Sequence, residues 1–360
     1  MTAVDVVIPC YNYGHYLHAC INSVLAQEDV DIRILIIDDA SPDNTAEICS
    51  ELAASDDRIN YVIHHKNIGH IATYNEGLLD WCTSEYCVLL SADDLLVTGA
   101  LKRAVTIMDN DKNIGLVYGR PYYFEKEACL PRFRSYRTTA VRWPGRKWIE
   151  CICRDGQNVI SAPEVVVRRT VQRAVGGYRS ELPHTADLEM WLRVAAVSDV
   201  AYVRGVPQAY YRRHECSMSR SRFYRERTAD LLGRKAAFDA FFDHHQATLP
   251  DCDRLREITN RALAREALWR ACRAYDRNRI EEASAEELVR FAGETYPAIG
   301  SVPEYAALRR RQWLGPAICS RTQVFAPPAI VRRLRGWLQQ QRWKKEGVYR
   351  RLQGSHAGLV

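Results

Sequence analysis

The first 120 residues predict an α/β fold with a mostly parallel central sheet. Apolar, β-branched runs alternate with stretches of helical periodicity, and the central runs lack polar alternation. Such runs are typical of strands that helices cover on both faces, and this order of strands and helices favours parallel strands with right-handed crossovers. The expected strands are residues 5–8, 32–37, 59–63, 86–90 and 115–118, and the expected helices are residues 16–26, 45–54, 71–81 and 100–108.

The rest of the chain changes character twice. Residues 121–220 show a mixed pattern of aromatic strand-like pieces and one expected helix over residues 187–197. From about residue 223 the chain consists of helical stretches rich in Ala, Arg, Glu and Leu, up to about residue 296. We therefore predict an α/β domain over residues 1–220, a helical C-terminal region over residues 221–315, and a linker with a basic tail over residues 316–360.

The composition is that of an ordinary globular protein, with 47% hydrophobic and 26% charged residues in a chain of 360. No apolar run approaches the roughly 18 residues that a membrane-spanning helix needs. The N-terminus enters a strand-like segment at Val4 without a basic start or an apolar leader, so we expect a cytoplasmic protein. The 12 cysteines form no CxxC pair, which favours free thiols in a reducing compartment over zinc ligands.

The net charge of +6 belongs to the tail, because residues 329–352 hold eight Arg or Lys and one acid, Glu346. The body of the chain is close to neutral, and we expect no nucleic-acid partner. Within the tail, Ile330, Leu334, Trp337 and Leu338 recur at helical spacing between the basic residues. The tail therefore reads as a basic amphipathic helix, which either contacts an anionic membrane surface or packs on its own domain.

Acidic residues follow two of the expected strands, as Asp38-Asp39 and Asp93-Asp94. Ligands of parallel sheets bind beyond the carboxyl ends of the strands. Carboxylates this close together need a cation or hydrogen-bond donors to stay charged, and Mg²⁺ is held by one or two carboxylates plus substrate phosphates. The alternative is that each pair caps the helix or turn that follows it. No GxGxxG or GxxxxGK[ST] pattern is present, which argues against a dinucleotide cofactor and a P-loop enzyme.

Six segments in order resemble the motifs of family 2 glycosyltransferases, which have the GT-A fold and use nucleotide sugars. They are Val6–Asn12, Ile36–Thr45, Asn67–Gly69 with Asn75–Leu78, Ser91–Asp94, Gly176–Tyr178 with Asp187–Arg193, and Tyr211–His214 with Ser217 and Ser219. The resemblance covers roughly residues 4–220 and not the last 140 residues. It implies a nucleotide-binding half over residues 1–120 and an acceptor half over residues 121–220.

The resemblance also implies a role for each matching residue. Nucleotide contacts are implied for Pro9, Tyr11, Asn12, Asp39, Asn67, Gly69 and Asp93. Ligation of Mg²⁺ or Mn²⁺ is implied for Asp94 and His214, and sugar or acceptor contacts are implied for Trp191 and Glu189. Asp187 is implied to be the general base. The chain departs from the family where Thr73-Tyr74 stand, since the family often has Ala-Arg there.

The chemistry accounts for these residue types. A sugar hydroxyl is a poor nucleophile, so a positioned carboxylate such as Asp187 is needed as it attacks. One base and a metal-stabilised leaving group imply a single displacement with inversion, without the second carboxylate of retaining glycosidases. Gln339–Trp343 fits the QxxRW pattern of processive synthases, but it follows Asp187 by about 150 residues, and we interpret it as coincidence.

The sequence thus predicts inverting, metal-dependent, non-processive transfer from a nucleotide sugar, with a UDP-sugar favoured, to a hydroxyl of a glycan or lipid-linked acceptor at the cytoplasmic membrane face. The alternatives are a nucleotidyltransferase of similar fold and an inactive nucleotide-sugar-binding protein. For single residues, structural interpretations also remain open. Asp187 could cap its helix, Trp191 could be core, His214 could lie on the surface, and Tyr11 could be a packing aromatic.

Overall fold

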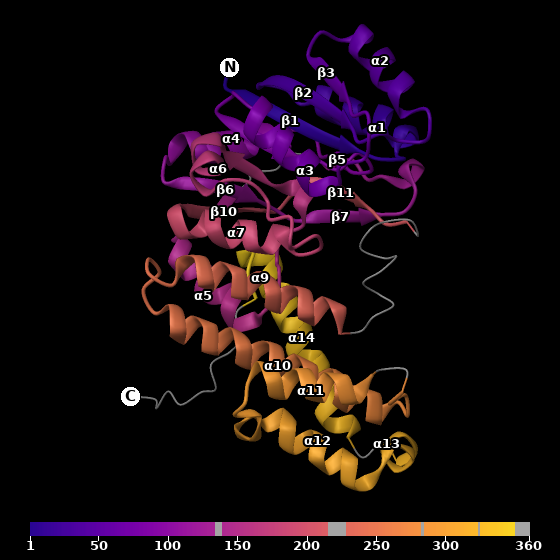
Figure 1. Ribbon diagram of the computed structural model, residues 1–360, viewed down its shortest axis with the longest axis vertical. Helices are drawn as coiled ribbons and strands as arrows, with labels where there is room; N and C mark the ends of the chain where they lie inside the picture. The colour runs from indigo at the N-terminus through magenta and orange to yellow at the C-terminus, as the bar shows by residue number, and fades with distance from the viewer. Residues whose placement is uncertain (134–138, 215–227, 282–283, 323–324, 350–360) are drawn as a thin grey trace. The chain divides into compact units, whose positions relative to one another are not determined.

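A computed structural model of the protein describes residues 1–133, 139–214, 228–281, 284–322 and 325–349 (Figure 1). The chain forms two compact units. The sheet unit contains residues 1–149, 158–215 and 345–347, and the helical unit contains residues 150–157, 216–344 and 348–360. The boundary that we predicted near residue 221 lies outside the described residues. Among the described helices, none is both long and apolar enough to cross a membrane.

The sheet unit is built on an eight-stranded sheet in the order β3-β2-β1-β4-β9-β6-β10-β8. Its strands are β1 (Ala3–Cys10), β2 (Asp31–Asp38), β3 (Ile59–Ile63), β4 (Tyr86–Leu89), β6 (Ile114–Tyr118), β8 (Thr139–Trp143), β9 (Val166–Arg168) and β10 (Asp199–Arg204). The first four neighbours in this order are parallel, as are β6 and β10. The short β9 runs antiparallel between β4 and β6, and β8 pairs antiparallel with β10. The predicted α/β fold with a mostly parallel sheet is confirmed.

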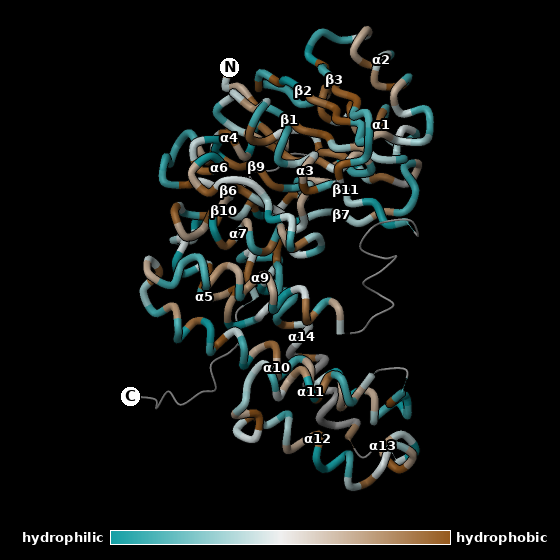
Figure 2. The backbone as a smooth tube through the Cα atoms, viewed as in Figure 1, coloured by the Kyte–Doolittle hydropathy of each residue, from teal (hydrophilic) through white to brown (hydrophobic). Residues whose placement is uncertain are grey.

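Helices cover this sheet and bury its central strands. They are α1 (Gly14–Leu25), α2 (Thr45–Ser55), α3 (His70–Asn75), α4 (Ala100–Asn110), α6 (Arg169–Val175) and α7 (Ala186–Val197). Val4, Val6 and Ile8 on one face of β1 and Asp5 and Val7 on the other are all fully buried, as a strand covered on both faces requires. Figure 2 shows the hydrophobic residues gathered along β1 and β2.

The helix that we predicted over residues 71–81 differs in detail, because α3 is followed by a π-helical turn, η1 (Glu76–Trp81). Such turns are rare and often lie beside functional sites. Gly77 lies in this turn directly against β1. A Cβ atom at Gly77 would stand 2.2 Å from Val7 Cγ1, so the turn approaches the strand as closely as only glycine permits.

A second sheet of three strands, in the order β5-β11-β7, lies in the same unit. Its strands are β5 (Leu95–Leu96), β7 (Pro121–Phe124) and β11 (Ala209–Arg212). Because β5 directly follows the acidic pair Asp93-Asp94 and pairs with β11, the sheet brings the segment Arg212–His214 to those acids. Two short 3-10 helices, η2 (Glu127–Cys129) and η3 (Ala162–Glu164), complete this part of the unit.

The helical unit contains α9 (Ala229–His245), α10 (Cys252–Asp276), α11 (Ala285–Thr295), η4 (Ile299–Ser301), α12 (Pro303–Leu314), α13 (Pro316–Thr322) and α14 (Ala326–Glu346). Helix α5 (Gly145–Asp155) begins in the sheet unit and ends in the helical unit. Residues 316–322 are helical where we predicted a linker. Proline is well tolerated at the first position of a helix, where its missing N–H has no intrahelical partner, so Pro316 begins α13.

Gly77→Ala should destabilise the sheet unit. The added Cβ would meet Val7 at 2.2 Å and Ile37 at 3.2 Å, both on buried strands that cannot yield freely. We expect overpacking to lower the free energy of unfolding by roughly 1–3 kcal/mol, measured by denaturant unfolding with circular dichroism. Gly300→Ala is the control, because no atom lies within 4 Å of its added Cβ. Equal stability of the two variants would contradict the close approach of η1 to β1.

Candidate active site

The loops that follow β1 and β2 are joined by hydrogen bonds. The backbone N–H of Asp39 donates to the carbonyl oxygen of Cys10 (2.9 Å), and that of Asn12 donates to Ser41 Oγ (2.9 Å). Asn12 has a φ of 58°, a left-handed conformation that asparagine tolerates better than most residues. Tyr11 is 50% exposed and Pro9 is partly exposed, so Tyr11 is not a packing aromatic of the core.

Asp39 holds the loop that precedes α3. Its carboxylate accepts hydrogen bonds from the backbone N–H groups of Ile68 (2.8 Å) and Gly69 (2.9 Å), and the Asn67 side chain donates to its carbonyl oxygen (3.1 Å). Gly69 has a φ of 89°, which a side chain would strain. The structure therefore brings together all the residues predicted for the nucleotide from the first three loops. Asp39 thus also holds the loop of residues 67–69 in place.

His64 is a member of this group that the sequence did not reveal. One ring nitrogen lies 2.8 Å from Asp39 Oδ1 and the other lies 2.9 Å from Glu76 Oε2. Burial lowers the pKa of His64, but the two carboxylates outweigh it and raise the pKa above its usual value. Burial raises the pKa of Asp39, but the hydrogen bonds from His64 and the two amides outweigh burial. The pKa of Asp39 is therefore below its usual value. These three donors thus offset the cost of burying the Asp39 charge.

The turn that carries Asp93 and Asp94 is fixed by the segment after β11. Asp94 is 3% exposed, and its Oδ1 accepts the backbone N–H of Arg212 (2.8 Å). The Arg212 guanidinium donates to the carbonyl oxygen of Asp93 (2.8 Å) and pairs with Glu127. His214 Nε2 lies 3.0 Å from Asp93 Oδ2, so His214 is not an isolated surface residue. Neither acidic pair caps a helix, because α2 begins after Asn44 and α4 begins after Gly99. Asp38 does cap the turn after β2, since its Oδ1 accepts the backbone N–H of Ser41 (2.9 Å).

The electrostatics of this turn fit a bound cation. Burial and the neighbouring charge of Asp93 raise the pKa of Asp94 well above its usual value. Within the described ranges, no group of three or more His, Cys, Asp or Glu side chains is arranged to hold a metal ion. Mg²⁺ needs only one or two carboxylates when substrate phosphates supply other ligands. A metal at the Asp93-Asp94 turn would therefore need a diphosphate to supply its other ligands, because the side chains of Asp93, Asp94 and His214 do not by themselves form such a group.

Asp187 lies in the first turn of α7, one residue inside the helix. Thr185 occupies the N-cap position, so Asp187 is not the cap that we considered as an alternative. Asn158 Nδ2 donates to Asp187 Oδ2 (2.8 Å), and the backbone N–H of Leu188 donates to Oδ1 (2.8 Å). Burial outweighs these hydrogen bonds and raises the pKa of Asp187 to about 6. Asn158 has no readable signal in the sequence, since it orients Asp187 across 29 residues.

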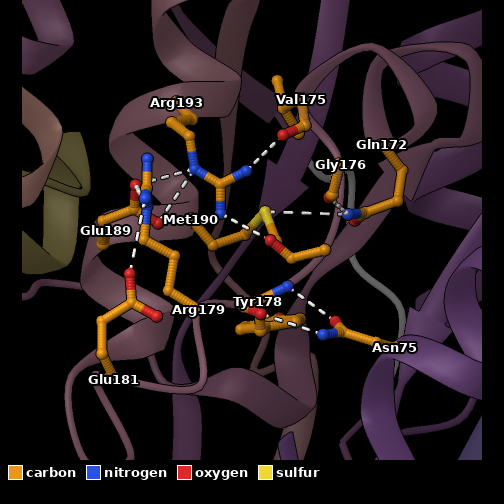
Figure 3. A network of polar contacts seen from close by, with 11 residues as sticks. Asn75, Gln172, Val175, Gly176, Tyr178, Arg179, Glu181, Glu189, Met190 and Arg193 are labelled. Carbon is orange, nitrogen blue, oxygen red and sulfur yellow. Dashed lines mark hydrogen bonds and ion pairs between the residues drawn. The ribbon is translucent and has the colours of Figure 1, made fainter. Parts of the chain in front are cut away.

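Glu189 does not have the exposed position that an acceptor contact requires. Its side chain is fully buried and lies between Arg193 (2.8 Å) and Arg179 (2.8 Å), as Figure 3 shows. Arg193 also donates to the carbonyl oxygens of Val175 and Gly177. This network fixes the loop before α7 to the helix itself. We expected Glu189 to contact the sugar or acceptor, and its burial corrects that expectation. Glu189 instead holds the helix that carries Asp187.

Trp191 requires a similar correction, because it is only 2% exposed. Its ring packs edge-on against Tyr178 (centroids 6.2 Å apart), and Tyr178 packs edge-on against Tyr74 (5.8 Å). Asn75 clamps the main chain of Tyr178 with two hydrogen bonds of 2.9 and 2.6 Å (Figure 3). Trp191 is therefore the buried base of an aromatic ladder from α7 to α3. Of these three rings, Trp191 and Tyr178 are buried, whereas Tyr74 is half-buried.

Comparisons with known proteins agree with this architecture. Residues 5–160 match the family described as glycosyl transferase family 2. The chain is similar to the glycosyltransferase GlyG of Streptococcus pneumoniae, with 29% identity over 34% of this chain and 40% of that protein. It is also similar to the chondroitin synthase of Pasteurella multocida, with 31% identity over 32% of this chain and 12% of that protein. The matching part thus spans less than half the length of these relatives.

Among solved structures, the fold is similar to that of S. aureus TarS 1–349, with a TM-score of 0.57 and 14% identity over 87% of this chain and 91% of that chain. At this identity the likeness shows the fold alone. Together with the family match, it shows that the chain carries a family 2 glycosyltransferase domain with the GT-A fold.

Glu189→Gln should test the buried network. The change leaves Arg193, which is 5% exposed, without its carboxylate. Breaking a buried ion pair costs roughly 3–5 kcal/mol, so we expect a clearly lower melting temperature by differential scanning calorimetry. Asp187→Asn on the same helix is the control, since burial already favours the neutral form of that side chain. If Glu189→Gln melted like the unaltered protein and only acceptor binding weakened, the structural role would be wrong.

Proposed function

We propose that this protein transfers a sugar from a nucleotide sugar to a hydroxyl group of an acceptor, in one displacement that inverts the anomeric carbon. The observation that carries the proposal is the pairing of two unlike acidic sites. The Asp93-Asp94 turn has acids that could hold a cation, which in turn would bind a diphosphate. Asp187 is a separate, oriented carboxylate with a raised pKa. The loops with Asp39 and Asp93-Asp94 follow β2 and β4, the two parallel neighbours of β1, and the rings of Tyr74, Tyr178 and Trp191 connect α3 to the helix of Asp187. This arrangement supports one site that includes both kinds of acid.

The donor is a UDP-sugar in this proposal. TarS, which shares the fold, is described in complex with UDP-GlcNAc and with UDP. In this chain, the loops that contain Pro9, Tyr11 and Asp39 meet at the carboxyl ends of β1 and β2, where parallel sheets bind their ligands. Three donors already bind the Asp39 carboxylate, two at Oδ1 and one at Oδ2, which leaves about one acceptor site, on Oδ2, for the N–H of a uracil ring.

The reaction itself assigns one step to each group. The acceptor oxygen attacks the anomeric carbon while its proton passes to the Asp187 carboxylate, and the bond from that carbon to the diphosphate oxygen breaks. The electron pair of the broken bond stays on the diphosphate. A bound Mg²⁺ or Mn²⁺ supplies neutralising charge there, and Asp94, Asp93 and His214 are the residues that would hold it. Asn158 keeps the Asp187 carboxylate oriented for the proton.

A panel of nucleotide sugars with Mg²⁺ or Mn²⁺ tests the proposal, with glycan and lipid-linked acceptors and release of nucleoside diphosphate as the readout. NMR of the product reports inversion. Asp94→Asn should lose the response to metal while the protein remains folded. Release of pyrophosphate from a nucleoside triphosphate and a sugar phosphate would instead support a nucleotidyltransferase, and nucleotide-sugar binding without turnover would support an inactive binding protein.

The pH dependence of transfer should report Asp187. The base acts only when ionised, so kcat/KM should rise with pH through about 6 and level off above it. Asp187→Asn should lose roughly 10²–10⁴-fold in kcat and the rise near pH 6, while still binding UDP. The contribution of Asp187 to folding stability changes with pH in the opposite direction to kcat/KM. Because the pKa rises on folding from 3.8 to about 6, the stabilisation is complete below pH 3.8 and is lost as pH rises through about 6. If Asp187→Asn leaves the dependence of kcat/KM on pH unchanged, the general base is another residue.

We also propose that the tail attaches the enzyme to the membrane that holds a lipid-linked acceptor, without processive elongation. On α14, Leu334 and Trp337 are 58% and 57% exposed, with Lys344 and Lys345 exposed further along the helix. Exposed apolar residues on a basic helix suit an anionic lipid surface.

The double variant Leu334→Ala, Trp337→Ala should lose flotation with vesicles that contain an anionic lipid. Apolar insertion is removed, and the remaining attraction of the basic residues is screened by salt. Trp313→Ala is the matched control, since Trp313 is 85% exposed on α12. Flotation of the double variant that equals that of the control would exclude this role for the tail.

A further inference from the structure

Tyr74 lies in α3, between the loop that Asp39 holds and the helix that carries Asp187. Helix α3 begins after Gly69, whose backbone N–H donates to Asp39. The Tyr74 ring packs on Tyr178, which packs on Trp191, one turn after Asp187 in α7. The charges of Asp93, Asp94 and Asp187 also act on the Tyr74 phenol, in agreement with this position. In the proposed reaction, the transferred sugar extends from the diphosphate at the Asp93-Asp94 turn to the acceptor oxygen at Asp187. A side chain packed between the nucleotide loops and the helix of Asp187 borders the path that the sugar would take.

The ring of Tyr74 is held in place by its neighbours. It packs edge-on against Tyr178 (5.8 Å, 76° between the rings) and against His70 (5.4 Å, 64°). Tyr178 is in turn fixed by the ring of Trp191 and by the main-chain hydrogen bonds of Asn75, the residue after Tyr74. A hydroxyl on such a ring has few orientations to lose when a ligand binds, which favours positioning over loose contact.

The Tyr74 hydroxyl is also a free donor. It makes no hydrogen bond to another residue in the part of the chain that the structure describes, and its side chain is only half-buried. Burial and the surrounding carboxylates raise the pKa of Tyr74, so the group keeps its proton at every pH at which the enzyme can work. Between three acids, a neutral O–H group is a donor that neither repels a sugar nor competes for a cation.

We propose that Tyr74 positions the transferred sugar by donating a hydrogen bond from its phenol to one hydroxyl of that sugar, and so contributes to the choice of donor. This inference rests on the proposed function. Because a hydrogen bond to one hydroxyl depends on its presence and configuration, Tyr74 should discriminate between sugars that differ at that position. Its contribution should concern the sugar and not the uridine, which in the proposed function would lie against the loops after β1 and β2.

Tyr74→Phe tests the inference because it keeps the ring and removes only the hydroxyl. We expect kcat/KM for transfer to fall about tenfold, the factor that corresponds to one lost hydrogen bond of about 1.4 kcal/mol. The affinity for UDP, measured by calorimetry, and the melting temperature should not change. Tyr122→Phe is the matched control, since that phenol is 37% exposed on β7 and its ring packs against Phe133 and Tyr210.

A series of donors that each lack one sugar hydroxyl identifies the partner. For one of them, the unaltered enzyme should lose about as much rate as Tyr74→Phe loses with the full sugar, and the substitution should add nothing further. Equal rates for Tyr74→Phe and the unaltered enzyme, or losses that add for every donor, would overturn the inference. So would a parallel loss of UDP affinity and melting temperature. If the unaltered enzyme transfers no sugar, it is the proposed function that fails.

Discussion

The edge at which β1, β2 and β4 end gathers carboxylates beside an apolar sheet, and each of those charges must be stabilised by something. Burial disfavours a charged carboxylate unless hydrogen bonds or opposite charges offset it. The backbone provides part of this, since the N–H groups of Ile68, Gly69 and Arg212 all point at acidic oxygens. A small set of side chains provides the remaining hydrogen bonds and opposite charges. These partners are distributed unevenly among the acids, and this difference decides what each acid can do.

The acids differ in how completely they are paired. Asp39 is bound by two amides and His64, and Glu189 is bound by two arginines, so each of these acids has several donors and holds neighbouring segments in place. Asp94 has one amide and an acidic neighbour, and Asp187 has one amide and a neutral amide side chain. Incompletely paired acids have raised pKa values and gain most from a cation or a proton. Chemistry is therefore expected at Asp94 and Asp187.

The sequence was sufficient for the sheet and for the acids at its edge, because strand and helix periodicities are local signals. It was insufficient for partners that come from distant segments, such as Arg212, which binds the Asp94 side chain across 118 residues. Glu189 shows a case where a local signal did exist. It lies two residues after Asp187, and residues at that spacing do not share a helix face, whereas Arg193 four residues later does. The helix geometry thus separates the buried acid from the reactive one.

The aromatic ladder follows from the same constraint. An oriented carboxylate on α7 is useful only if the helix is held at a fixed distance from the nucleotide-binding loops. The ion pairs of Glu189 fix α7 to the loop that contains Tyr178, and Asn75 fixes that loop to the end of α3. Helix α3 begins directly after Gly69, whose amide binds Asp39. A continuous path of contacts therefore connects the anchor of the nucleotide loops to the helix of the proposed base, and Tyr74 lies along it. The residues that complete the substrate site are thus also those that set its dimensions, which is why packing residues and binding residues are hard to separate in this unit.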